Sequence, residues 1–363
     1  MRIVILGPFP PFRGGISHFN IALYRALTLH HTVLAINFTT QYPAVLFPGK
    51  TQYEENTVGE EIQAVRLLSS INPFTWFRTA KKIRSFGPDV ILTSFWMSFF
   101  APAYGMVLRW CRNREKPVRR ITLFHNVFGH EKHIMDKGLL PYLLPVCDQA
   151  VTLSGSVTQD LKSLDYAKPI ITAFHPIYDI FGSMINRDEA KISLGYSSND
   201  KLILFFGYIR DYKGLDLFIE ASRIVSDRGV QCKYLAVGES YIDTKVYTQL
   251  IKNVGMQKHF KLQVTFVPDS HVARYFSAAD LVVCPYKSAT QSGIIQIAYH
   301  FDRPVVVTRV GGLEQMVADG LSGQLADPTP ESIADGIHEY LTQHSPEETE
   351  SFIQSYKERF NWS

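Results

Sequence analysis

The chain has 363 residues, of which 46% are hydrophobic and 20% charged, and its formal net charge is +3. This length fits two domains of moderate size better than one, and the composition is that of a globular protein with an ample core. The four cysteines are scattered without a CxxC pair. That pattern argues against a disulfide framework or a zinc site and favours a reducing, cytoplasmic compartment.

The first element predicted along the chain is a strand, Arg2–Leu6, whose apolar run is too short for a signal peptide. Short apolar runs then alternate with helical patterns from end to end, which predicts parallel sheets with crossover helices. The other strands predicted in the first half are Thr32–Phe38, Gln63–Leu68, Asp89–Phe95, Arg120–Phe124, Ala150–Ser154 and Pro169–Phe174.

A glycine pair, Gly14-Gly15, follows the first predicted strand in a loop that begins at Gly7. Paired glycines at the start of a helix let the backbone approach a ligand closely, because no Cβ lies in the way. The spacing is not GxGxxG, so a dinucleotide-binding dehydrogenase is not indicated. A long surface turn is the alternative interpretation of this loop.

A cluster of positive charge follows the apolar run Phe95–Trp110. It comprises Arg109, Arg112, Arg114, Lys116, Arg119 and Arg120, and residues 1–180 hold 19 Lys and Arg against 12 Asp and Glu. The apolar run is shorter than the ~20 residues that a transmembrane helix needs. The cluster fits contact with anionic lipid or with an anionic substrate. A core helix followed by a solvated loop explains it equally well.

His125 and Asn126 directly follow the predicted strand Arg120–Phe124. A histidine just past the carboxyl end of a strand faces the same sheet edge as the early glycine pair. A lone histidine is usually structural. The nearby run His130-Glu131-Lys132 makes this loop densely polar, which favours a functional role for His125.

The alternation breaks once, between His175 and Asp200, and we place an interdomain linker near residues 176–185. The sequence thus predicts an N-terminal domain over residues 1–180 and a C-terminal domain over 181–345. Residues 346–363 have a helical pattern, and we expect this helix to pack back towards the N-terminal domain. The strands predicted in the second domain are Lys201–Phe206, Lys233–Val237, Lys261–Phe266, Leu281–Pro285 and Pro304–Thr308.

The most informative motif is the turn from Gly207 to Gly214, which carries Arg210 and Lys213. It joins a predicted buried strand to a helical pattern that begins at Leu215. Open α/β sheets bind ligands at this position, where backbone N–H groups and the helix dipole favour anions. Two cations three residues apart suit a diphosphate better than a lone phosphate. The turn therefore indicates a nucleotide-sugar site.

A second anion-binding candidate starts the helix after the strand Leu281–Pro285. Ser292 is predicted as the N-cap of this helix. The N–H groups of Ser292, Gly293 and Ile294 could hold a phosphate. A plain helix start is the alternative.

Together these segments resemble the retaining GT-B glycosyltransferases of family 4, the glycosyl transferases group 1, over nearly the whole chain. The resemblance rests on the early glycine pair, the histidine after a strand, the turn from Gly207 to Gly214 and a Pro-Val-Val, Gly-Gly, Asp-Gly-x-x-Gly ending over residues 304–323. It implies an α/β fold of GT-B type, with two Rossmann-like, doubly wound parallel-sheet domains and a cleft between them.

The resemblance also implies roles for individual residues. Arg210 and Lys213 would bind the donor's diphosphate, and His125 would contact the transferred sugar, so that these three are the candidate catalytic residues. The candidate donor-binding residues are Gly14, Gly15, Gly207, Val267, Pro268, Ser292, Gly293, Ile294 and Gln296. Of these, Val267 and Pro268 would flank the nucleobase. The acceptor would bind mainly to the N-terminal domain.

The chain departs from the family pattern in three places. Tyr208 stands where family members have an arginine in the diphosphate turn, and Arg210 lies two residues further on. Family members carry two glutamates spaced E-x7-E, yet no Asp or Glu occurs between Asp280 and Asp302, whichever alignment is chosen. Gln296 could replace one glutamate as a neutral hydrogen-bonding group to ribose. Family members also have a glutamate in a Gly-Gly-x-x-Glu motif, whereas this chain reads Gly-Gly-Leu-Glu-Gln, so that Glu314 lies one position before the expected place.

The predicted reaction is transfer of a hexosyl group from a UDP- or GDP-sugar to a hydroxyl of a glycan or lipid-linked acceptor, with retention. Arg210, Lys213 and helix amino termini would stabilise the leaving diphosphate. The sequence has no Asp-x-Asp, so no metal or other cofactor is expected. The expected partners are the donor, an acceptor of cell-envelope polysaccharide synthesis and the inner face of a membrane, but not nucleic acid.

Two alternatives stay open. The first is a catalytically silent nucleotide-sugar-binding or scaffold protein of the same fold, which the missing glutamates favour and the retained Arg210, Lys213 and His125 oppose. The second is a sugar-nucleotide 2-epimerase, which would need acidic residues for elimination. The stretch without carboxylates between Asp280 and Asp302 weakens this second alternative.

Overall fold

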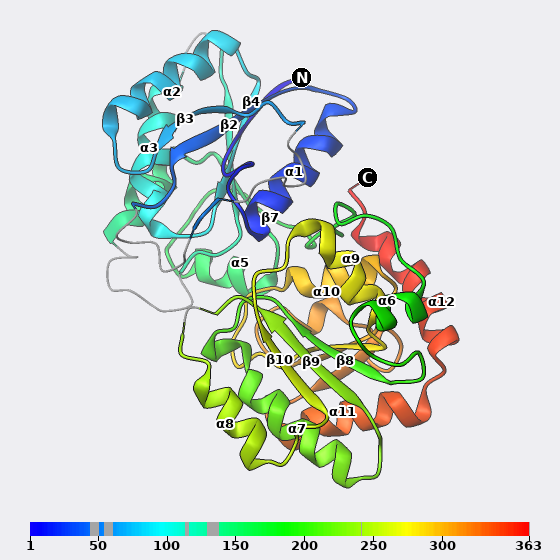
Figure 1. The fold of residues 1–363 in the computed structure, drawn as a ribbon. Coiled ribbons are helices and arrows are strands. Elements are labelled where there is room, and N and C mark those ends of the chain that lie inside the picture. The colour runs from blue at the N-terminus through cyan, green and yellow to red at the C-terminus, as the bar shows by residue number, and fades with distance from the viewer. Residues whose placement is uncertain (44–50, 54–60, 113–115, 129–137, 241, 363) are drawn as a thin grey trace. The chain divides into compact units, whose positions relative to one another are not determined.

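The computed structural model describes residues 1–43, 51–53, 61–112, 116–128, 138–240 and 242–362. The chain divides into two compact units: Met1–Phe174 together with Trp362, and His175–Asn361 (Figure 1). Each unit is built around one sheet in which every strand pairing is parallel, as the alternation of apolar runs and helical patterns predicts. Residues 173–186, which span the boundary between the units, contain no helix or strand.

The sheet of the first unit has seven strands in the order β3-β2-β1-β4-β5-β6-β7. All seven predicted strands are present, with ends shifted by one or two residues. Their bounds are β1 (Arg2–Leu6), β2 (Thr32–Thr40), β3 (Val65–Ser69), β4 (Val90–Phe95), β5 (Arg119–Phe124), β6 (Gln149–Thr152) and β7 (Ile170–Thr172). The α-helices described in this unit are α1 (Gly15–Thr28), α2 (Pro73–Phe86), α3 (Ala101–Trp110) and α5 (Gly155–Lys162).

Helix α2 shows how local sequence sets these helices. The Asn72 side chain accepts a hydrogen bond from the backbone N–H of Phe74, and proline occupies the first helical position. The helix ends at Gly87, whose φ of 64° lies in the left-handed region that favours glycine. Its buried residues, Thr79, Ala80 and Ile83, share one face and join the core of the first unit.

The sheet of the second unit has six strands in the order β10-β9-β8-β11-β12-β13. The bounds are β8 (Leu202–Phe206), β9 (Lys233–Gly238), β10 (Phe260–Val264), β11 (Leu281–Cys284), β12 (Val305–Thr308) and β13 (Gly323–Ala326). The sequence did not predict β13, because its four residues include a glycine and directly follow a turn motif. Pairing with β12 makes the segment a strand, and a Cβ on Gly323 would lie 2.0 Å from the Val305 carbonyl oxygen.

Helices cover both faces of this second sheet (Figure 1). On one face, α7 (Leu215–Asp227), α8 (Lys245–Asn253) and α11 (Pro330–Gln343) share a core with the strands. The other face carries α6 (Arg187–Ser193), α9 (Asp269–Ala278), α10 (Gly293–His300) and α12 (Pro346–Tyr356). After α12 the chain reaches Trp362, whose ring centroid lies 5.2 Å from that of Phe19 in the first unit.

The strand order reverses once in each sheet, between β1 and β4 and between β8 and β11. At such a point the two connections leave the carboxyl ends of neighbouring strands in opposite directions, and ligands of open α/β sheets bind there. The segments after β8 and β11 are those that carry the predicted diphosphate motifs. Among the helices in the described ranges, none is long and apolar enough to cross a membrane.

Candidate functional site

The turn after β8 packs directly on the segment after β11. Gly207 has φ 111°, and the Ile294 side chain lies 3.5 Å from the position where a Cβ on Gly207 would be. Gly214 has φ 67°, and a Cβ there would lie 1.9 Å from the carbonyl oxygen of Pro285. These contacts bring the predicted diphosphate turn and the start of α10 together.

The Lys213 ammonium lies over the face of Tyr286, 3.7 Å from the ring centroid. Tyr286 is itself held at both ends: its hydroxyl bonds the Ser292 hydroxyl at 3.1 Å, and its carbonyl accepts the Thr308 hydroxyl at 2.6 Å. The negative face of an aromatic ring stabilises a cation without neutralising it. Tyr286 therefore holds the lysine charge in place.

Burial lowers the pKa of Lys213 to about 8, and the nearby Arg210 charge acts in the same direction, while Cys284 opposes it. The proton of this ammonium is thus more easily lost than that of an exposed lysine. An anion that binds beside Lys213 would raise its pKa again.

The two carboxylates near this turn are neutralised by another lysine. The Lys287 ammonium lies 3.0 Å from Asp211 and 2.8 Å from Asp216, and the backbone N–H of Lys287 donates to the Tyr212 carbonyl. Within the described residues, Lys213 forms no ion pair with a carboxylate. The charge of Lys213 is therefore left for an anion from outside the chain.

The start of α10 differs in one respect from the prediction. Ser292 occupies the N-cap position, but its side chain does not cap the helix, because its hydroxyl bonds Tyr286 instead. The Ser292 side chain therefore leaves the first N–H groups of the helix to other partners, among which an anion would be favoured.

Gln296 lies in the first turn of α10 and is fully buried. Neither its amide nitrogen nor its amide oxygen has a hydrogen-bond partner among the residues that the structure describes. A buried amide without partners is costly to the fold. The side chain therefore has capacity for a polar ligand group.

Tyr178, which lies in the predicted linker, packs against the start of α10, and His175, just before that linker, contacts Tyr178. A Cβ on Gly293 would lie 3.0 Å from the Tyr178 ring, and the Tyr178 hydroxyl is 3.4 Å from Nε2 of His175. Burial lowers the pKa of His175 to about 4. No spacing rule points to these contacts, since 115 positions separate Tyr178 from Gly293.

We expect His175 to make the second unit sensitive to acid. Its pKa is about 4 in the folded protein against an ordinary 6.5, so only the unfolded chain binds the extra proton between these values. Stability should therefore fall as the pH decreases from 6.5 towards 4, by about 3 kcal/mol at most. Denaturant titrations over this range would measure the slope, and His175→Gln should reduce it. An unchanged slope in His175→Gln would contradict the prediction.

Val267 and Pro268 lie between β10 and α9, at the same edge of the sheet as the turn after β8 but two strands away. Pro268 is exposed and directly precedes α9, and Val267 is half-buried. The proposed contact of these two residues with the nucleobase stays a prediction. The described contacts do not join them to Lys213.

In the first unit, the glycine pair and His125 meet at α1. Gly14, with φ 111°, precedes the helix, and Gly15 is its first residue. His125 follows β5 and is buried, and its ring packs edge-to-face on Phe19 of α1 at 4.8 Å. The predicted polar run His130-Glu131-Lys132 lies outside the described residues.

Within the described ranges, no group of three His, Cys, Asp or Glu side chains is placed to hold a metal ion. The expectation of a metal-independent reaction stays a prediction, and Arg210 and Lys213 are the cations that would take the metal's part.

Residues 200–343 match the family model described as Glycosyl transferases group 1. This segment of the chain is therefore similar to that family. The matched residues include the Gly207–Gly214 turn, Tyr286 and the whole of α10, so the match falls on the part of the chain that forms the candidate site.

Among curated proteins, the D-inositol 3-phosphate glycosyltransferase of Mycolicibacterium gilvum is 28% identical to this chain over 183 residues. The match covers 49% of this chain and 40% of that protein. The chain thus spans less than half the length of this relative.

Two solved structures have the same fold as this chain. The HepE protein of Anabaena, in complex with UDP and glucose, has a TM-score of 0.76 and 15% identity, covering 100% of this chain and 96% of that one. Sucrose-phosphate synthase from Thermosynechococcus elongatus has a TM-score of 0.71 and 16% identity, with the same coverage. The predicted GT-B fold, with two Rossmann-like parallel sheets, is confirmed.

Proposed function

We propose that the second unit binds a nucleoside diphosphate sugar, with the diphosphate on Lys213, Arg210 and the first N–H groups of α10. The observation that carries this proposal is the environment of Lys213. Its ammonium lies over Tyr286 while Lys287 neutralises the neighbouring carboxylates, so an external anion is its natural partner. The UDP found with the HepE protein of Anabaena, which has the same fold, supports a nucleotide in this role.

The reaction proposed is transfer of the sugar, a hexosyl group, to an acceptor hydroxyl with retention of configuration. The bond between the anomeric carbon and the diphosphate oxygen breaks, and a bond from the acceptor oxygen to that carbon forms on the same face. The acceptor proton passes to the departing phosphate. Lys213, Arg210 and the start of α10 stabilise the charge that develops on the diphosphate, which is where electrostatic stabilisation acts most strongly.

The remaining assignments rest on the family resemblance. Gln296, with its buried and unpartnered amide, is the proposed partner of the ribose, and Val267 and Pro268 are the proposed neighbours of the nucleobase. In the first unit, Gly15 is proposed to border the donor phosphate, and His125 is proposed to contact the transferred sugar. The acceptor is proposed to be a glycan or a lipid-linked saccharide at the inner face of a membrane, near the basic cluster Arg109–Arg120, of which residues 113–115 lie outside the described ranges.

Thermal stability with UDP, GDP, ADP and CMP, in EDTA, tests the binding step. A ligand at 100 times its dissociation constant stabilises the folded protein by about 2.7 kcal/mol. We expect one nucleoside diphosphate to stabilise the wild type and not Lys213→Ala. No shift with any of the four would overturn the proposal.

A silent nucleotide-sugar-binding protein is the second candidate, because no carboxylate occurs between Asp280 and Asp302 and Gln296 is neutral. The same nucleotide panel cannot separate it from an enzyme, so turnover has to be followed. Release of the diphosphate from the matching nucleotide sugar, with and without candidate acceptors, distinguishes the two: binding without release favours the silent protein.

A further inference from the structure

The solvent face of α2 exposes large apolar side chains that the core does not use. Phe74 is 84% exposed and Phe77 53%, and Ile71, just before the helix, is 54% exposed. Single exposed apolar residues are normal on a protein surface, but three within seven positions form a patch. Such a patch indicates an interaction surface.

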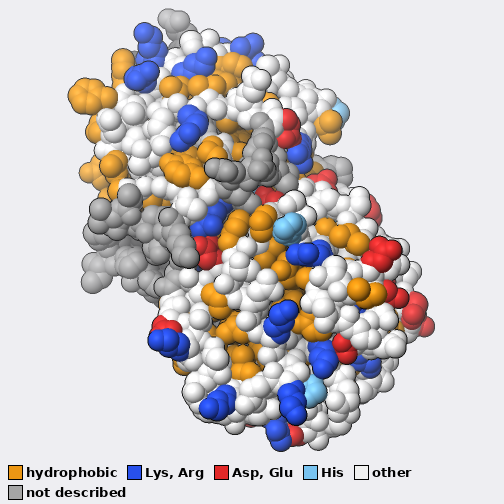
Figure 2. Space-filling model, viewed as in Figure 1, with side chains coloured by type: hydrophobic (Ala, Val, Ile, Leu, Met, Phe, Trp, Pro, Cys, Tyr) orange, Lys and Arg blue, Asp and Glu red, His pale blue; other side chains and the backbone are white. Residues whose placement is uncertain are grey.

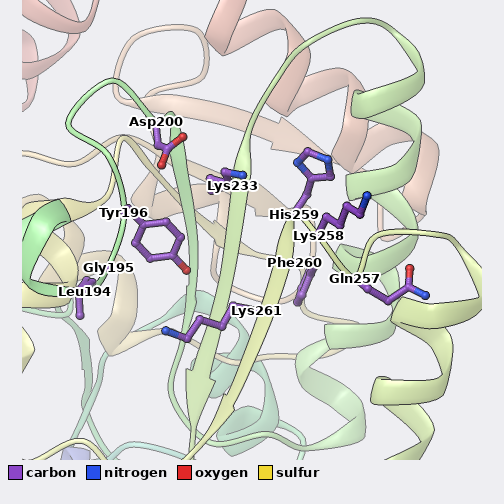
Figure 3. A pocket seen from close by; sticks show the side chains of 10 residues that line it. All are labelled: Leu194, Gly195, Tyr196, Asp200, Lys233, Gln257, Lys258, His259, Phe260 and Lys261. Atoms are coloured by element: carbon purple, nitrogen blue, oxygen red, sulfur yellow. The ribbon is translucent and has the colours of Figure 1, made fainter.

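Cations surround these side chains. At 3.6 residues per turn, Phe74, Arg78 and Lys81 share one face of α2, opposite the buried Thr79, Ala80 and Ile83. Within the described residues, Arg78, Lys81 and Lys82 form no ion pair. Figure 2 shows hydrophobic side chains beside Lys and Arg side chains over the part of the first unit that carries α2. We call Ile71, Phe74, Phe77, Arg78 and Lys81 the α2 face.

The end of α3 extends this surface. The Phe77 and Trp110 rings pack edge-to-face at 5.9 Å, and the Arg84 guanidinium donates to the Trp110 carbonyl. Arg109 and Arg112 lie beside Trp110 in the chain and are exposed. Arg109 and Arg112 of the basic cluster therefore extend the α2 face, and one surface combines aromatic rings with positive charge.

The structure assigns to the α2 face a docking role on an anionic lipid surface, with Phe74 and Phe77 inserted among the acyl chains and the surrounding cations on the headgroups. Residues 71–120 hold ten Lys and Arg against two Asp and Glu, so an anionic partner complements them. A second copy of the chain would bring like charges together. Aromatic and basic residues mixed on one helix face are typical of interfacial membrane binding, to which each Lys or Arg near an anionic surface contributes.

This inference deepens the proposed membrane contact of the basic cluster, and it does not depend on the nucleotide site. Lys213 and its neighbours belong to the second unit, whereas the α2 face belongs to the first. Loss of lipid binding and loss of nucleotide binding can therefore be observed separately.

Sedimentation of the full chain with vesicles tests the inference. We expect binding to vesicles that contain phosphatidylglycerol, weak binding to phosphatidylcholine alone, and release at high salt, because screening shortens the range of charge attraction. The double variant Phe74→Ala/Phe77→Ala should bind the anionic vesicles at least about tenfold more weakly, since each lost ring removes buried apolar area. The Phe74→Trp variant should still bind these vesicles, and brominated lipid should quench the fluorescence of the introduced tryptophan.

The matched control is Leu29→Ala, which removes a side chain that is 76% exposed in the same unit but away from α2. It should bind as the wild type does. A thermal unfolding midpoint without ligand that equals that of the wild type shows that the fold of the double variant is intact. Equal binding of wild type and double variant would overturn the inference. So would wild-type dimerisation that the double variant abolishes, because a second copy would then cover the face.

Discussion

Replacing Lys213 with methionine is expected to weaken nucleoside diphosphate binding by about 100-fold, which corresponds to about 2.7 kcal/mol. Methionine keeps an unbranched apolar side chain against the Tyr286 ring. It removes the ammonium group, which lies 3.7 Å from the centroid of that ring. A hydrogen bond that involves a charged group contributes more than a neutral one, and here no described carboxylate competes for the charge. Calorimetric titration with the diphosphate that stabilises the wild type measures the effect.

The pH dependence of this affinity shows whether the charge of Lys213, rather than the shape of its side chain, is responsible for binding. Lys213 loses its proton as the pH rises through about 8, so wild-type affinity should fall above that pH. Lys213→Arg keeps a charged group at every accessible pH, and its affinity should stay level. Lys252→Met, a change on the surface helix α8, is the control and should bind as the wild type does. A Lys213→Met variant within threefold of the wild type would contradict the assignment of the diphosphate to this lysine.

Replacing Gly214 with alanine is expected to lower the free energy of unfolding of the second unit by at least about 3 kcal/mol. The added Cβ would lie 1.9 Å from the carbonyl oxygen of Pro285, and the backbone φ of 67° is unfavourable for any residue with a side chain. Since the contact is with backbone on both sides, no side chain can rotate out of the way. Urea titration followed by a probe of the second unit measures the loss.

Gly229→Ala is the matched control for this experiment. Gly229 has a φ of 84°, yet a Cβ there would meet nothing within 4 Å. The Gly229→Ala variant should therefore lose only the free energy of unfolding that comes from the unfavourable backbone φ, about 1 kcal/mol. The difference between the two variants isolates the collision with Pro285. If both variants lost the same stability, the close approach of the turn to the segment after β11 would not hold in solution.

The sequence predicted the strands well because most are short, largely apolar runs between helical patterns, and such runs are typical of the strands of a parallel sheet covered by helices. It failed at Gly323–Ala326, where pairing with β12 rather than local preference makes the strand. A four-residue segment that contains glycine and glutamine has no such signature of its own.

At the site, the sequence identified the charged residues but not what holds them. Lys213 and Arg210 could be predicted because a glycine turn between a strand and a helix has a local pattern. Tyr286 could not, because its contact with Lys213 joins residues 73 positions apart and depends on β8 and β11 being neighbours. Ser292 does occupy the predicted N-cap position, and the same long-range contact explains why its hydroxyl bonds Tyr286 instead of capping α10.

Because of Trp362, only one of the two units can be produced as a single continuous fragment of the chain. The second unit is one continuous stretch of chain, 175–361, whereas the first takes its last aromatic ring from beyond that stretch. That ring packs on Phe19, and Phe19 packs on His125. A fragment that stops at Phe174 would therefore leave Phe19 with one face uncovered and alter the surroundings of the histidine. Anyone who wishes to study the first unit in isolation has to graft the terminal tryptophan back onto it.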